Sequence, residues 1–153
     1  MAKIEATEKQ TFEVHAPLEA VYEAFSDPQI IKENFVGLER AEISEDGVAR
    51  WILKEKVDVG LRFKGDYTVK YDGNGKDRIT WRGLSGNIDT DAEVLLTQLD
   101  TSVRVEYRET ITPDLPIPGL MAKVFKPIVA REVRKDLTKY VDNVKRYIAR
   151  HHG

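Results

Sequence analysis

The chain contains 153 residues, of which 33% are charged and 41% are hydrophobic, and its formal net charge is -2 at pH 7. That length suits one domain with a sizeable core, so we expect a single domain over residues 1–153. The near balance of charge provides no basic field for nucleic acid. The absence of cysteine excludes disulfides, thiol nucleophiles and zinc knuckles. Because His15, His151 and His152 are poorly placed for a metal site, we expect neither a metal nor a cofactor.

The N-terminal segment, residues 1–9, is charged and lacks the apolar core of a signal peptide. No stretch of the chain approaches the roughly 18 consecutive apolar residues that a membrane-spanning helix needs. We therefore expect a soluble, cytoplasmic protein with no integral membrane segment. The sequence leaves the oligomeric state open.

The first predicted elements are a strand and two short helices. Alternating apolar and polar side chains predict a strand over residues 9–16. Pro17 ends that strand and suits the first turn of a helix, which begins at Leu18. Pro28 ends this helix, because the residue before a proline disfavours the helical conformation, and a second helix is predicted over residues 28–34.

The middle of the chain consists of alternating segments separated by turns that contain glycine and asparagine. Their alternation is typical of an antiparallel sheet with one face in water. About six strands are predicted between Leu38 and Pro113, among them residues 48–57, 61–71, 78–84, 88–99 and 103–112.

A long helix is predicted at the C-terminal end, after a proline-rich loop at residues 113–119. Apolar residues recur there at helical spacing, and charged residues occupy the rest of the surface. We expect Pro127 either to kink this helix or to mark where its regular part begins. The apolar stripe predicts the face that packs on the sheet: Val133, Leu137, Tyr140, Val141, Val144 and Ile148.

This order of elements predicts an α+β fold in which a curved antiparallel sheet wraps around the last helix. Such a sheet leaves space between itself and the helix. Inward aromatic side chains would either fill this space as a core or line a cavity for an apolar ligand, and the sequence supports both interpretations about equally. The residues concerned are Trp51, Phe63, Tyr67, Tyr71, Trp81 and Tyr107.

Two carboxylates, Glu55 and Glu109, fall on the apolar side of their strands. In an apolar cavity such a carboxyl group has a raised pKa and can act as a general acid or base. A strand end, a bulge or a neighbouring arginine would instead place the group in solvent or in an ion pair. In the absence of a supporting motif, the second interpretation is favoured for both residues.

The start of the chain resembles a known superfamily. Residues 12–22, Phe-Glu-Val-His-Ala-Pro-Leu-Glu-Ala-Val-Tyr, followed by Ser26-Asp27-Pro28, are similar to the opening of the START-related, polyketide-cyclase-like (SRPBCC) superfamily. Residues 36–39, 57–60 and 63–65 are similar to segments of proteins related to the G component of carbon monoxide dehydrogenase. The resemblance covers essentially the whole chain.

The resemblance implies a helix-grip fold: a curved seven-stranded antiparallel sheet around a long C-terminal helix, with two short helices after strand 1 and a hydrophobic ligand cavity. Its members include lipid and sterol carriers, plant-hormone receptors, ubiquinone-binding proteins and aromatase/cyclases. Because one cavity architecture hosts all these activities, the fold leaves the function open.

We therefore expect a protein that binds or transports a small hydrophobic molecule, whether lipid, polyketide-like or aromatic, and we assign no catalytic residue. The loop at residues 115–120 is expected to form part of the entrance. The predicted lining residues are Phe25, Trp51, Leu53, Phe63, Tyr67, Trp81, Tyr107, Glu109, Val124, Phe125, Ile128, Val133 and Leu137.

Two other functions stay open. In a polyketide cyclase or aromatase, Glu109, Glu55 or a tyrosine would transfer protons within the cavity. A buried Glu109 with a raised pKa would support this alternative, and an exposed Glu109 would exclude it. A protein that binds partners through its outer surface would instead have a filled core.

Overall fold

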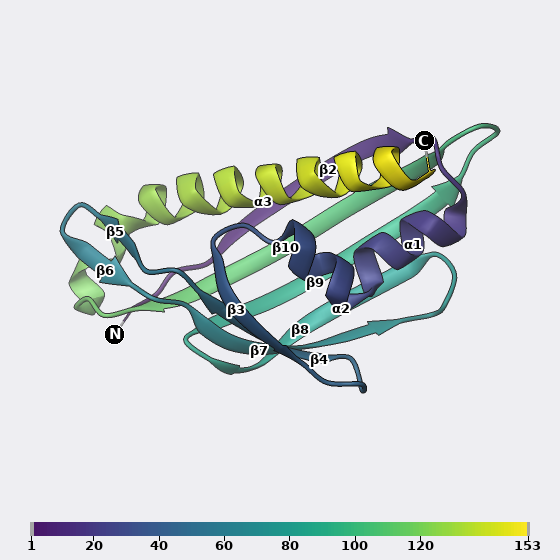
Figure 1. Ribbon diagram of the computed structural model, residues 1–153. Helices are drawn as coiled ribbons and strands as arrows, with labels where there is room; N and C mark the ends of the chain where they lie inside the picture. Colours follow the sequence, from purple (N-terminus) through teal and green to yellow (C-terminus); the bar gives the residue numbers. More distant parts are fainter. Residues whose placement is uncertain (1, 153) are drawn as a thin grey trace.

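The computed structural model describes residues 2–152, which form a curved antiparallel sheet around one long helix (Figure 1). Two short helices lie beside the long one, against the same side of the sheet. In chain order the elements are β1 (Ala2–Lys3), β2 (Ala6–Val14), α1 (Leu18–Ser26), α2 (Pro28–Asn34), β3 (Leu38–Ile43), β4 (Val48–Leu53), β5 (Lys56–Asp58), β6 (Leu61–Phe63), β7 (Asp66–Gly73), β8 (Arg78–Gly86), β9 (Ile88–Gln98), β10 (Val103–Leu115), the short 3-10 helix η1 (Gly119–Met121) and α3 (Ala122–His152).

The strand order of the main sheet is β1-β10-β9-β8-β7-β4-β3, and β2 also pairs with β10. Since β1 pairs with the end of β10 at Leu115 and β2 pairs with it from Ile111 onward, β1 extends the edge that β2 forms. The predicted α+β helix-grip architecture is confirmed. The expected seven strands correspond to this sheet with β1 and β2 counted together, and β5 and β6 form a separate two-stranded sheet.

The two short helices form where the prolines predict them. Asp27 ends α1 and begins α2, where its side chain accepts a hydrogen bond of 2.9 Å from the backbone N–H of Gln29. Pro28 occupies the first turn of α2, where its missing N–H leaves no partner unsatisfied. These helices bury Phe25 and Ile31 against the sheet and α3.

The strands predicted over residues 48–57 and 61–71 are not continuous, and this part of the prediction is wrong. The chain leaves the main sheet after Leu53 and rejoins it at Asp66, and a hydrogen bond of 2.9 Å from the Leu53 N–H to the Gly65 carbonyl marks the branch point. The β5–β6 hairpin between these points reaches α3. There Arg131 contacts Asp58 at 2.6 Å, and Lys56 contacts both Glu132, at 3.3 Å, and Asp136.

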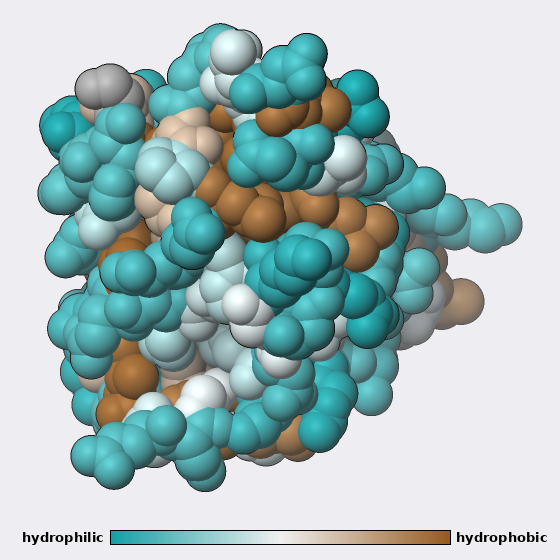
Figure 2. Space-filling model, turned by 90° about the vertical axis from the view of Figure 1, so that its right-hand side faces the viewer, coloured by the Kyte–Doolittle hydropathy of each residue, from teal (hydrophilic) through white to brown (hydrophobic). Residues whose placement is uncertain are grey.

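The long helix α3 packs its predicted stripe against the sheet, and Pro127 lies inside the helix rather than at its start. Its other face is charged. Seen from the end at which α3 finishes, the surface is mostly hydrophilic, with small hydrophobic areas between the polar side chains (Figure 2). Within residues 2–152, none of the helices combines the length and the hydropathy that crossing a membrane requires.

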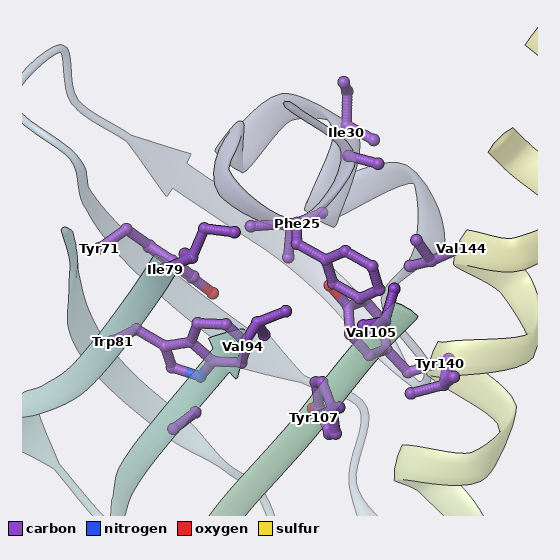
Figure 3. Packing of buried hydrophobic residues seen from close by; sticks show 14 of the residues in the cluster. Phe25, Ile30, Tyr71, Ile79, Trp81, Val94, Val105, Tyr107, Tyr140 and Val144 are labelled. Atoms are coloured by element: carbon purple, nitrogen blue, oxygen red, sulfur yellow. The ribbon is translucent and has the colours of Figure 1, made fainter. Parts of the chain in front are cut away.

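The core is divided along α3. The larger cluster joins α1, α2, the sheet and the second half of α3, and Figure 3 shows Trp81, Tyr107 and Tyr140 converging within it. A smaller cluster joins β1, the end of β10 and the first half of α3 through Phe125, Val129 and Leu137. The two clusters are separate along the helix. The candidate site lies between the sheet and the first half of α3, beside the smaller cluster.

Candidate functional site

A cavity of about 540 Å³ lies between the sheet and the first half of α3. This volume falls within the range of small-molecule sites. Most of its wall is apolar or aromatic. Ten of the predicted lining residues do line it: Trp51, Leu53, Phe63, Tyr67, Trp81, Glu109, Phe125, Ile128, Val133 and Leu137.

Three predicted residues do not line the cavity. Phe25 and Tyr107 have the expected inward direction, but both are fully packed, at 0% and 2% exposure, where α1 covers the sheet. Val124 is 55% exposed on the surface of α3, because the inward face of this helix runs through Phe125, Val129 and Val133 instead. In the proline-rich loop, Leu115 lines the cavity, Ile117 is buried in the smaller core cluster and Pro116 is exposed.

Several lining residues lie where the sequence carries no direct signal. Phe35, Val36 and Gly37 connect α2 to β3, and this irregular segment forms one side of the opening. Tyr140 belongs to the predicted stripe of α3, but its contact with the cavity depends on where along the helix the sheet curves away. Helical spacing identifies which face of α3 is buried, but it does not show which of the buried residues reach the cavity.

Glu109 is the one predicted carboxylate that the structure buries, at 8% exposure. Its Oε2 accepts hydrogen bonds of 3.1 Å from the Trp81 Nε1–H and 3.0 Å from the Thr90 hydroxyl. Its Oε1 accepts a hydrogen bond from the Tyr107 hydroxyl. Burial raises the pKa of the Glu109 carboxyl, and these three hydrogen bonds oppose that rise only in part.

The expectation that Glu109 lies in solvent or in an ion pair is therefore wrong. Among the ion pairs of residues 2–152, none includes Glu109. For Glu55 the same expectation is confirmed: it is exposed and contacts Arg62 at 3.0 Å. The chain breaks away from β4 just before Glu55, so the inward alternation of that strand no longer applies to it.

A row of aromatic rings crosses the closed side of the site. From α2 across the sheet to α3, neighbouring ring centroids lie between 4.9 and 6.4 Å apart, within the usual range for aromatic contacts. The row consists of Phe35, Trp51, Tyr71, Trp81, Tyr107 and Tyr140. It provides flat apolar walls with a few polar atoms at their edges.

The tyrosines near Glu109 are neutral phenols. Burial first, and then the Glu109 carboxylate, raise the pKa of Tyr67 and of Tyr140. The Tyr140 hydroxyl is buried without a hydrogen-bond partner in the described part of the chain. Tyr67 likewise makes no hydrogen bond through its hydroxyl within residues 2–152, although its side chain is buried. The hydroxyls of Tyr67 and Tyr140 thus line the cavity without a hydrogen-bond partner among residues 2–152.

The exposed lining residues lie on the side that opens to solvent. They are Gly37, Lys54, Lys56, Val57, Lys135 and Lys139, from the α2–β3 connection, the β5–β6 hairpin and α3. Charged side chains are therefore gathered at the opening, while Glu109 is the charged lining residue that is fully buried. This arrangement suits a ligand whose buried part is mostly apolar.

The sequence matches the family model described as polyketide cyclase / dehydrase and lipid transport, over residues 1–149. No protein with a curated function matches the sequence. The match spans β1 to nearly the end of α3, and so includes every element that lines the cavity.

Solved structures with the same fold share little sequence with this chain. The Zhui aromatase/cyclase from Streptomyces sp. has a TM-score of 0.72 at 18% identity, covering 95% of this chain and 94% of that one. A START superfamily protein from Mycobacterium smegmatis has a TM-score of 0.69 at 15% identity, with 94% and 97% covered. Norcoclaurine synthase from Thalictrum flavum, in complex with dopamine and hydroxybenzaldehyde, has a TM-score of 0.63 at 13% identity, with 99% and 91% covered.

Proposed function

Because the chain belongs to the polyketide cyclase / dehydrase and lipid transport family, we propose that it binds a small, mostly apolar molecule in the cavity between the sheet and α3. The observation that carries this proposal is the cavity itself, about 540 Å³ enclosed mainly by aromatic and aliphatic side chains. A protein that acted only through its outer surface would have no need to leave this space unfilled, since unfilled space costs stability.

The ligand would gain affinity mainly from burial of its apolar surface, at roughly 25 cal/mol per Å² before the costs of ordering are subtracted. The two tryptophans, Trp51 and Trp81, are the largest side chains that line the cavity. The few polar groups of the cavity interior would orient the molecule rather than hold it.

Native mass spectrometry of the purified protein, together with organic extraction and mass spectrometry of the extract, tests this proposal. We expect a co-purifying apolar compound, or saturable binding of a fluorescent fatty acid that extracted lipids displace. If no compound co-purifies and the fluorescent fatty acid does not bind, the proposal fails.

A second candidate function is an intramolecular cyclisation in the same cavity, and the buried Glu109 carboxyl supports it. A raised pKa makes this group a stronger base at neutral pH than an ordinary carboxylate. In an aldol cyclisation it would take a proton from the carbon beside one carbonyl. That carbon would bond to a second carbonyl carbon, whose oxygen would receive the proton, and loss of water would follow.

This candidate is tested with a linear poly-β-ketone thioester, whose cyclised products absorb in the near ultraviolet. We expect faster cyclisation than in buffer alone, and loss of that acceleration in Glu109→Gln while the compound still binds. Equal rates with and without the protein would leave binding alone as the function.

A further inference from the structure

The two unpaired phenols in the cavity, Tyr67 on β7 and Tyr140 on α3, point to the chemistry of the ligand. Both side chains line the cavity, and they come from opposite walls, the sheet and the helix. A buried hydroxyl without a partner is unfavourable, so a native site usually supplies one. Within residues 2–152, the Tyr140 hydroxyl is buried without a protein partner, and the Tyr67 hydroxyl, on a side chain that is 9% exposed, makes no hydrogen bond to the protein.

Two of the neighbouring polar groups already have hydrogen-bond partners. The Trp81 indole and the Thr90 hydroxyl both donate to Glu109, which lies on the same cavity wall. Tyr107 donates to Glu109, and its ring centroid lies 6.3 Å from that of Tyr140, while Tyr67 lines the same cavity as Glu109. Besides the indole of Trp51 and the hydroxyl of Tyr71, the hydrogen-bonding capacity that remains for a ligand on the cavity walls is that of the Tyr67 and Tyr140 hydroxyls.

We propose that the ligand carries an uncharged hydroxyl or ketone oxygen, which is bound by the hydroxyls of Tyr67 and Tyr140 beside Glu109. This inference rests on the proposed binding function and names the class of molecule that the cavity takes. A neutral phenol both donates and accepts, so it pairs with a ketone oxygen and with a hydroxyl group alike.

Charged groups fit this side of the cavity less well. A carboxylate would lie near Glu109, and the lysines that line the cavity, Lys54, Lys56, Lys135 and Lys139, are all exposed at its opening. An ammonium group would have to compete with three donors already directed at Glu109, and it would have to leave water to reach this side of the cavity. An uncharged oxygen avoids both penalties.

The test compares naphthalene, naphthol and naphthylmethylamine, which share one apolar body and differ in their polar group. Their binding to the full chain is measured by fluorescence titration. A hydroxyl group without a partner weakens transfer into an apolar site. A preference for naphthol over naphthalene, which we expect to be about threefold to tenfold, therefore reports a hydrogen bond.

The preference should fall in Tyr67→Phe and in Tyr140→Phe and disappear in the double variant, while naphthalene still binds. Tyr147→Phe, a change on α3 outside the cavity lining, is the matched control and should keep the preference. Naphthalene binding in each variant shows that the cavity is intact.

Equal binding of naphthalene and naphthol by the unmodified protein would overturn the inference and leave the binding function standing. Tighter binding of the amine than of naphthol, or a preference for naphthol that survives in the double variant, would also overturn it. If none of the three compounds binds, the inference fails together with the proposed function.

Discussion

Trp81 and Glu109 are joined by a hydrogen bond of 3.1 Å although they lie on β8 and β10, which are not neighbouring strands. The strand between them, β9, presents Ala92, which is the register partner of both residues. Because alanine ends at Cβ, the indole ring and the carboxylate can meet above it. A buried carboxylate is thereby held by a donor from two strands away.

Replacement of Ala92 by leucine is therefore expected to place a side chain where Trp81 and Glu109 meet. Overpacking of this kind destabilises a core by about 1–3 kcal/mol. Urea unfolding measures the loss, and the tryptophan fluorescence spectrum reports the changed surroundings of Trp81. Ala149→Leu, at an exposed position of α3, is the control and should leave the unfolding curve and the fluorescence spectrum unchanged. An unaltered unfolding curve for Ala92→Leu would contradict this account of the packing.

The raised pKa of Glu109 predicts a particular dependence of stability on pH. An acid whose pKa is higher in the folded than in the unfolded state stabilises the fold below its unfolded value, here about the ordinary 4.5. That stabilisation is lost as the pH rises through the folded-state pKa. Glutamine does not ionise, so Glu109→Gln removes this loss of stability. The variant should therefore gain stability relative to the unmodified protein as the pH rises above 4.5, and the gain should level off above the folded-state pKa.

Urea unfolding of both proteins from about pH 4 to about pH 8 measures this difference. Glu39→Gln provides a control of opposite sign, because the hydrogen bond from Lys64 lowers the pKa of Glu39 and its removal should weaken the protein as the pH rises. A Glu109→Gln difference that is constant over the whole range would show that the carboxyl titrates normally.

The sequence predicts the inner surface of an unbroken strand well. β10 runs from Val103 to Leu115, so simple alternation places Tyr107 and Glu109 on the inward side. Where a strand is interrupted the same rule fails. Glu55 follows the point at which β4 ends, and the hairpin that carries it turns toward α3. Such a branch depends on contacts with a helix that lies more than seventy residues later, as in the pair Lys56–Glu132.

The alternation of polar and apolar residues also does not show how deep in the core an inward side chain lies. Phe25 and Tyr107 point inward as predicted, yet Phe25, on α1, packs against Tyr107 with ring centroids 6.3 Å apart, so both belong to the core instead of the cavity wall. Phe35 and Gly37 line the cavity because the chain folds back after α2, and nothing in their local pattern indicates that path. The burial of Glu109 depends on Trp81, Thr90 and Tyr107 together, a combination that no spacing in the sequence reveals.

The cavity can be tested by filling it. Leu53 lines the cavity near its opening, so Leu53→Trp should reduce the affinity for the fluorescent fatty acid about tenfold or more by occupying the ligand's space. Val124→Trp is the matched control, because that position is 55% exposed on α3 and outside the lining. Equal affinities in the two variants would mean that the probe binds elsewhere on the protein.

The β5–β6 hairpin should move more freely when its ion pairs with α3 are removed. Lys56 contacts Glu132 and Asp136, and its side chain is 48% exposed, so each pair contributes only about 0.2–1 kcal/mol. Lys56→Ala should therefore speed amide hydrogen exchange in β5 and β6 by a few-fold without changing the rest of the sheet. Lys64→Ala, which breaks the pair with Glu39 outside the hairpin, should leave these amides unaffected. Unchanged exchange in Lys56→Ala would show that the hairpin is held by other contacts.

The buried tyrosines should respond to the loss of their hydroxyls in opposite ways. Tyr107 donates a hydrogen bond to the buried Glu109, so Tyr107→Phe should destabilise the ligand-free protein by about 1–3 kcal/mol. Tyr140→Phe removes a buried hydroxyl that has no partner within residues 2–152, so it should be neutral or stabilise by up to about 1 kcal/mol. Both changes delete one oxygen and leave the ring in place, which makes urea unfolding of the two variants a direct comparison. A loss of stability in Tyr140→Phe equal to that in Tyr107→Phe would show that the Tyr140 hydroxyl is satisfied in the free protein and is not reserved for a ligand.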